Sequence, residues 1–287
     1  AMLDRQLVIV SGKGGVGKSA VAVALALRAQ RAGKRVLVAA LLEDTGAAIH
    51  LGADSLGYQP THFDSGVAAM SVERAAALEE YLRVQMRVPA AAPTRTLSRA
   101  MQVLVDTAPG VREVISMGKP IYDTWRGEFD IVIVDAPPLG QLMSYLRAPA
   151  VVAGLVPTGG IKVQAGRMAD ALADAESSVL ALVTTPEELP AAETAQALRM
   201  LGDEDLIEVG AVIANRVIPP LAVTPDDVAG QPAGPGRDAA KHHLALLESQ
   251  HTALDPLSID IELPYLFGVH TPQEVAAQLA DFLEDAT

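Results

Sequence analysis

One glycine-rich stretch near the start of the chain constrains the fold more than any other part of the sequence. Apolar residues 7–10 lead into Ser-Gly-Lys-Gly-Gly-Val-Gly-Lys-Ser at residues 11–19, and an Ala/Leu-rich run with high helix propensity follows. Residues 12–19 match G-x-x-x-x-G-K-[ST], the phosphate-binding loop that connects a strand to a helix. The sequence therefore predicts an α/β protein of the P-loop NTPase class.

The same pattern assigns chemistry to individual residues of the loop. Its glycines leave backbone N–H groups free to face phosphates, and the following helix adds the positive end of its dipole. Lys18 is expected to reach the β- and γ-phosphates of ATP, and the Ser19 hydroxyl to bind Mg²⁺. The predicted nucleotide contacts in this segment are Gly12, Lys13, Gly14, Gly15, Val16, Gly17, Lys18, Ser19 and Ala20. A purely structural glycine turn is the alternative.

Lys13, directly after the first glycine, narrows the class. Gly-Lys-Gly-Gly-Val-Gly-Lys-Ser resembles the deviant Walker A loop of the family that contains the arsenical pump ATPase, the tail-anchored-protein targeting (GET) ATPase, and the division-site and plasmid-partition ATPases. The resemblance implies a nucleotide-sandwich dimer, in which Lys13 crosses to the partner's nucleotide and acts with Lys18 in catalysis. A solvated surface lysine is the alternative interpretation of Lys13.

The composition limits the partners that we expect. At 287 residues the chain is long enough for one large α/β domain spanning residues 1–287. Its net charge of −13 argues against nucleic acid as the main partner, because phosphate contacts need a basic face. No run of about 18 uninterrupted apolar residues is present, and no charged-then-apolar leader precedes the loop. We therefore expect a cytoplasmic protein without an integral membrane segment.

The second predicted strand, at residues 35–42, ends in Glu43 and Asp44. In the family that the loop resembles, this strand end is the first switch, where an Asp followed by Pro-Ala orients the attacking water. That Asp-Pro-Ala signature is missing here. Glu43 or Asp44 is a candidate to position the water in its place, and capping of the next turn is the alternative role for both. Hydrolysis is therefore expected to be slow or to depend on a partner.

A third buried strand, at residues 129–135, ends in an acid. Asp135 suits the carboxylate that supports Mg²⁺ in P-loop enzymes. Asp135 to Gly140 also resembles the family's second switch, Asp-x-x-Pro-x-Gly, and Gly140 would let a backbone N–H approach the γ-phosphate.

Two later segments resemble the adenine side of the family's nucleotide site. A predicted strand at residues 207–215 ends in Asn215, where the family's Asn reads the adenine amino edge; a turn-forming Asn is the alternative. Leu-Pro-Tyr at residues 263–265 is similar to the family's other adenine-side loop, so Pro264 and Tyr265 are further predicted contacts.

Two stretches, at roughly residues 66–126 and 141–175, are predicted to form a helical insertion that stands off the sheet. Within them we expect a helix from Ser71 to Arg87, another carrying Leu97 to Val105, and a third after Gly110. Six of the eight methionines lie in or beside these segments, which suits either core filling or an apolar surface for a hydrophobic protein client.

The predictions combine into a mostly parallel sheet with helices on both faces, a helical insertion subdomain, and an Mg·ATP-driven switch. The expected assembly is a homodimer, or a heteromer with a related ATPase, that closes on ATP and opens on hydrolysis to control a helical client or partner surface. The alternatives are a regulatory ATP-binding subunit with little hydrolysis and a division-site or partition-type positioning ATPase. The sequence contains no cysteine, so it lacks a Cys-x-x-Cys zinc clasp and the thiolates that capture arsenite, and its acidic last helix departs from the division-site branch.

Overall fold

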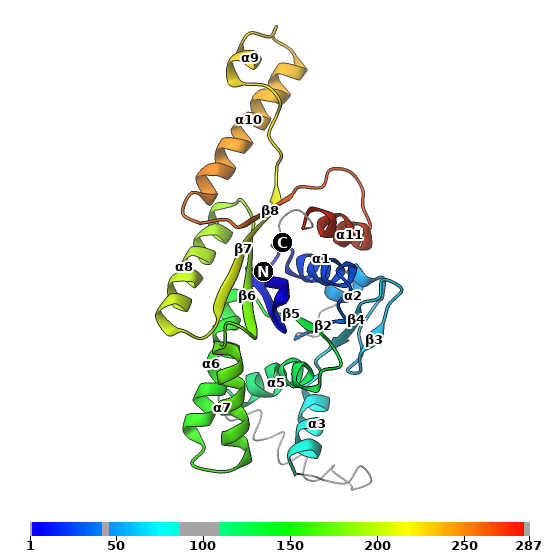
Figure 1. Ribbon diagram of the computed structural model, residues 1–287. Coiled ribbons are helices and arrows are strands. Elements are labelled where there is room, and N and C mark those ends of the chain that lie inside the picture. The colour runs from blue at the N-terminus through cyan, green and yellow to red at the C-terminus, as the bar shows by residue number, and fades with distance from the viewer. Residues whose placement is uncertain (1, 42–45, 87–109, 284–287) are drawn as a thin grey trace.

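The computed structural model describes residues 2–41, 46–86 and 110–283, which fold around a sheet of eight strands (Figure 1). The strand order is β3-β4-β2-β5-β1-β6-β7-β8. All neighbouring pairs are parallel except β3 with β4. The strands are β1 Leu7–Gly12, β2 Val36–Ala40, β3 Thr61–His62, β4 Ala68–Ser71, β5 Ile131–Asp135, β6 Ser178–Thr184, β7 Glu208–Val217 and β8 Ile261–Pro264. This confirms the predicted mostly parallel α/β sheet.

Helices cover both faces of this sheet. The helical elements are η1 Met2–Asp4, α1 Lys18–Arg31, α2 Gly46–Leu51, α3 Arg74–Met86, α5 Val111–Arg126, α6 Leu139–Leu155, α7 Gly160–Ala173, α8 Glu188–Glu204, α9 Pro225–Ala229, α10 Pro235–Leu254 and α11 Pro272–Phe282. Helices α1, α2 and α11 lie together on one face, and α5 to α8 belong to the other (Figure 1).

The central strands are almost continuously apolar because both faces are covered. In β1, Leu7 and Ile9 join the core beneath α5 and α6, whereas Val8 and Val10 join the core beneath α1 and α11. The α1 core is largely alanine, with Ala20, Ala22, Ala24, Ala26 and Ala29 buried against the sheet. These small side chains let α1 lie close to the strands, which agrees with the low aromatic content of 3%.

The region predicted as a helical insertion contains α3 and α5 before β5 and α6 and α7 after it, and differs from the prediction in two ways. Residues 68–71 form β4, parallel to β2, so the helix predicted from Ser71 begins at Arg74. The run Val-Ala-Ala-Met at 67–70 is short and apolar, and periodicity cannot separate a buried strand from a helix there.

The second difference concerns α5, which was predicted to stand off the sheet and instead contacts β1 and β5. Its side chains Val114, Met117 and Ile121 are buried in the core of that face. The helix predicted around residues 97–105 lies outside the described residues.

A hairpin of α9 and α10 extends from the sheet at the end of the molecule opposite α3 and α7 (Figure 1). Its first helix, α9, is short. Thr224 and Asp227 form a capping box there, which stabilises the start of a short helix. Within the three described ranges, no helix is both long and apolar enough to cross a membrane.

Candidate functional site

The phosphate-binding loop connects β1 to α1 at the centre of the sheet. Gly15 and Gly17 have φ angles of 88° and 91°, in the left-handed region that favours glycine. Gly12 is fixed by close packing, since a Cβ there would lie 2.0 Å from the Val183 carbonyl oxygen on β6. The Lys18 amine donates to the carbonyl oxygen of Lys13 at 3.5 Å, across the loop. The sequence thus places its glycines where the backbone needs them.

A cleft of about 580 Å³ lies beside this loop. Its lining comes from five parts of the chain: Gly15, Gly17, Lys18, Ser19 and Ala20 from the loop and α1; Gly46, Ile49 and His50 from α2; Asn215 and Arg216 from β7; Pro264, Tyr265, Leu266, Gly268 and His270 from β8 and the loop after it; and Pro272, Val275 and Leu279 from α11. This volume is within the range of small-molecule and cofactor sites. The fold therefore brings the two predicted adenine-side segments to the phosphate-binding loop.

Asp135 and Gly140 lie on the neighbouring β5–α6 connection. Asp135 ends β5 and pairs with Val10 of β1 in the parallel register, so both strands end at the same edge of the sheet. The Ser11 hydroxyl donates to the Pro137 carbonyl oxygen at 2.6 Å and ties this connection to β1. Gly140 is exposed in the first turn of α6, where helical N–H groups have no acceptor four residues earlier.

Lys13 lies outside the cleft lining, and its side chain contacts helix α8 of the same chain. Its amine is 2.5 Å from the Glu193 carboxylate on α8, and the two side chains are 25% and 40% exposed. Sequence reasoning did not single out Glu193, because a helical glutamate 180 residues away carries no local signal of such a contact. In the single chain, the Lys13 amine is therefore paired with an acid of its own subunit.

The cleft also contains residues that the sequence analysis missed. Arg216 has a φ of 62°, in the left-handed region, directly after Asn215. His50 Nδ1 lies 2.7 Å from the Gly46 carbonyl oxygen, and burial lowers the pKa of its ring. His270 Nε2 lies 2.8 Å from the Phe267 carbonyl oxygen. Glu43 and Asp44, the candidates for positioning water, lie outside the described residues.

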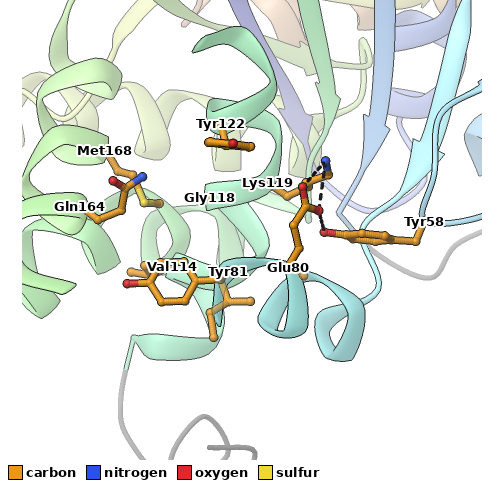
Figure 2. Close-up of a pocket in the computed structure, with 11 residues that line it drawn as sticks. Tyr58, Glu80, Tyr81, Val114, Gly118, Lys119, Tyr122, Gln164 and Met168 are labelled. Atoms are coloured by element: carbon orange, nitrogen blue, oxygen red, sulfur yellow. Dashed lines mark hydrogen bonds and ion pairs between the residues drawn. The ribbon is translucent and has the colours of Figure 1, made fainter. Parts of the chain in front are cut away.

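A second cavity, of about 50 Å³, lies between α3, α5 and α7 (Figure 2). Lys119 of α5 extends toward Glu80 of α3 at its edge, with nitrogen–oxygen distances of 3.3 Å to Glu80 and 2.9 Å to Asp123. The Tyr58 hydroxyl donates to the same Glu80 carboxylate. The remaining lining is Ala77, Tyr81, Val114, Ile115, Gly118, Tyr122, Gln164 and Met168. None of these residues belongs to the phosphate-binding loop.

The fold and the loop define a protein of the P-loop NTPase class, and comparison with known proteins identifies its family. Residues 5–158 match the anion-transporting ATPase family. The chain belongs to this family.

Individual relatives agree with this assignment. The chain is 31% identical over 235 residues to the ATPase BagA of Mycobacterium tuberculosis, an alignment that covers 78% of this chain and 68% of the relative. It is 25% identical over 242 residues to a putative arsenical pump-driving ATPase of Halobacterium salinarum, covering 75% of this chain and 36% of that protein. It is 29% identical over 169 residues to the ATPase get3 of Schizosaccharomyces pombe, an alignment that covers 56% of this chain and 49% of that protein. The predicted resemblance to the arsenical pump and GET ATPases is thereby confirmed.

Proposed function

We propose that the chain binds Mg·ATP in the cleft beside the phosphate-binding loop and hydrolyses it. The observation that carries this proposal is the convergence of Gly15, Gly17 and Lys18 with Asn215 and Tyr265 on one cleft of suitable size. The left-handed glycines and the N-terminus of α1 form a backbone surface that favours anions. A cytoplasmic location, where ATP is present, is part of this proposal.

Different groups around the loop bind the phosphates and the Mg²⁺ ion of Mg·ATP. Backbone N–H groups of residues 14–19 and the Lys18 amine hold the phosphates. Ser19 and Asp135 fit a Mg²⁺ site, because a hydroxyl and a carboxylate supply the oxygen ligands that this ion prefers. When bound, Mg²⁺ neutralises phosphate charge. Gly140, at the start of α6, offers a backbone N–H on the same edge of the sheet.

Lys13 gives the cycle its dependence on a second subunit. In the proposed dimer, homomeric or formed with a related ATPase, Lys13 leaves Glu193 and contacts the partner's nucleotide, while Glu43 or Asp44 orients water. The side chains of Lys13 and Glu193 are 25% and 40% exposed, so water screens their ion pair and breaking it costs little free energy. Closure on ATP and opening after hydrolysis then change the surroundings of the helices beside the sheet.

The turn between α6 and α7 is the proposed surface for a hydrophobic protein client. Val151, Leu155, Ile161 and Val163 lie in or beside this turn and are between 42% and 67% exposed. Contiguous exposed apolar side chains are typical of interaction sites. The test is protection of an apolar helical peptide from aggregation by the wild type and by Leu155→Ser/Val163→Ser. Leu189→Ser, at a residue of similar exposure on α8, is the matched control. If the wild type fails to protect the peptide, the proposal of a hydrophobic protein client is contradicted.

Steady-state ATP turnover by the wild type and by Lys18→Ala tests the proposal that the chain hydrolyses ATP. We expect turnover in the wild type and its loss in the variant, because Lys18 is the charge closest to the expected β- and γ-phosphates. Calorimetry with Mg·ATP separates the second candidate function, a regulatory ATP-binding subunit, which the missing Asp-Pro-Ala signature favours. Tight binding without turnover in the wild type would support that candidate and contradict the ATPase.

A further inference from the structure

Strand β7 is irregular near its end, and Arg216 lies in the irregular part. The register between β7 and β8 shifts between Ala214 and Val217. Arg216 has a φ of 62°, a left-handed conformation that a residue with a long side chain rarely adopts. Irregularities of this kind redirect a side chain, and they are frequent beside binding and active sites.

Two hydrogen bonds hold this part of β7 against the phosphate-binding loop. Asn215 Nδ2 donates to the Val16 carbonyl oxygen at 2.8 Å, and Asn215 Oδ1 accepts from the Arg216 N–H at 3.0 Å. The guanidinium group of Arg216 reaches the start of α1, since a Cβ added at Gly17 would lie 4.0 Å from its Nη2. Among the described residues, this guanidinium group forms neither a hydrogen bond nor an ion pair. It is therefore available to contact a ligand.

The cleft concentrates positive charge in an acidic chain. Arg216 and Lys18 both belong to its lining, which contains no Asp or Glu among the residues that the structure describes. The whole chain, by contrast, has a net charge of −13. The N-terminus of α1 adds a partial positive charge beside the two side chains. This combination attracts a polyanion, and a guanidinium group can bind phosphate oxygens through two parallel N–H donors.

The strand order shows from which side Arg216 approaches the loop. Strand β1, which leads into the loop, has β5 on one side and β6, β7 and β8 in succession on the other. Asp135 of the proposed Mg²⁺ site ends β5, whereas Arg216 and Tyr265 come from β7 and the end of β8. Arg216 therefore approaches from the side opposite the proposed Mg²⁺ site, next to the predicted base contacts.

From these observations we propose that Arg216 binds the phosphates that are not transferred, on the side of the phosphate chain nearest the base. It adds a second cation to that of Lys18 and strengthens the binding of ATP and ADP alike, without acting on the transferred phosphoryl group. Asn215 and Tyr265 remain the predicted contacts of the base. This inference deepens the proposed nucleotide function and rests on it.

Binding and turnover by Arg216→Gly and Arg216→Lys test the inference. Arg216→Gly removes the guanidinium group and suits the left-handed φ, so the fold should be retained, which thermal unfolding checks. Arg216→Lys keeps a positive charge but loses the pair of parallel donors. Calorimetry uses Mg·ATP, Mg·ADP and inorganic tripolyphosphate with Mg²⁺ as probes. Asp205→Gly is the matched control, because Asp205 also has a left-handed φ, of 48°, but lies at the end of α8 and outside the cleft lining.

A contact to phosphates that are not transferred predicts a loss of binding alone. We expect Arg216→Gly to bind all three probes about tenfold more weakly than the wild type. KM for ATP should rise by a similar factor with kcat unchanged, because the contact is equally strong in the ground state and the transition state. Arg216→Lys should lose less affinity, and Asp205→Gly should bind like the wild type. If Arg216→Gly does not fold, Arg216→Asn, which also tolerates the left-handed region, carries the same comparisons.

Three results would overturn the inference. Unchanged affinity of Arg216→Gly for ADP and tripolyphosphate would leave Arg216 as a solvated side chain. Weaker binding of ADP with unchanged binding of tripolyphosphate would assign Arg216 to the base or the ribose. A fall in kcat with unchanged affinity for ADP would assign it to the transferred phosphoryl group. In all three cases the wild type binds nucleotide and only this inference fails; if the wild type binds none of the probes, the proposed nucleotide function fails as well.

Discussion

The backbone conformation at Gly17 determines which residues this position of the loop tolerates. Its φ of 91° is left-handed, and a Cβ would collide with Asn215 Nδ2. We expect Gly17→Ala to lower the free energy of unfolding by about 1–2 kcal/mol, the usual cost of a left-handed L-residue. Urea denaturation without nucleotide measures it. Gly14→Ala is the control, because a Cβ there meets nothing within 4 Å. Equal effects of the two substitutions would contradict the conformational explanation.

Lys13 is the residue on which action across a dimer depends. We expect Lys13→Ala to bind Mg·ATP nearly as well as the wild type, because Lys18 and the loop backbone remain. Turnover should fall on the order of 10³-fold, as when a cation supplied by a partner is removed from a transferring phosphoryl group. Calorimetry and steady-state turnover measure the two effects. Unchanged turnover would show that Lys13 acts only in its ion pair with Glu193.

At the scale of elements, one buried charge cluster joins α5 to α3 (Figure 2). The side chains of Lys119 and Asp123 are both 6% exposed, and burial raises the pKa of Asp123. Lys119→Met leaves the Glu80 and Asp123 carboxylates without their cation. We expect it to lower the free energy of unfolding by about 3 kcal/mol in urea denaturation. The double variant Lys119→Met/Asp123→Leu should recover part of this loss; no recovery would mean that packing, not charge, causes it.

The starts of β2 and β5 are joined by Arg35 and Asp130. The Arg35 side chain and its backbone N–H bond the Asp130 carboxylate at 2.7 and 2.8 Å, and these hydrogen bonds lower the pKa of Asp130 to about 2. Because the folded-state pKa lies below the ordinary value of 3.8, the stability from this pair is present above pH 3.8 and is lost as the pH falls toward 2. We expect the destabilisation by Asp130→Asn, measured by urea denaturation, to shrink from pH 5 to pH 3. A constant difference would refute this linkage.

At the scale of the molecule, strand order places the loop at the centre of the sheet, with β5 beside β1. The predicted second switch lies where β5 leads into α6, and the α6–α7 turn follows at the other end of α6. In the proposed cycle, a single helix, α6, therefore connects the nucleotide site to the proposed client surface at the α6–α7 turn. We expect light scattering to show a dimeric mass with Mg·ATP and a smaller mass without it. Lys18→Ala should not respond to Mg·ATP. A mass that is independent of nucleotide would contradict the switch, while leaving ATP binding to be judged by calorimetry.

The sequence predicts the local features of this site, because each of them depends on a few neighbouring residues. The glycines at 15 and 17 were predicted from the loop pattern, and their left-handed φ angles explain why that pattern exists. The strand ending at Asp135 was found because a run buried on both faces is continuously apolar. Strand β4 was missed because four apolar residues have no distinctive period, and α5 was wrongly placed off the sheet because its apolar side chains do not specify what they pack against.

By itself, then, the sequence determined the class of fold, the loop and the ends of its flanking strands, since backbone conformation and burial leave a signal within a few neighbouring residues. Only the tertiary structure decided the contacts between distant segments. It paired Lys13 with Glu193, added Arg216, His50 and His270 to the cleft, and turned the Asn215 amide onto the Val16 carbonyl group. These contacts depend on the distances between strands and helices, which no local stretch of sequence encodes.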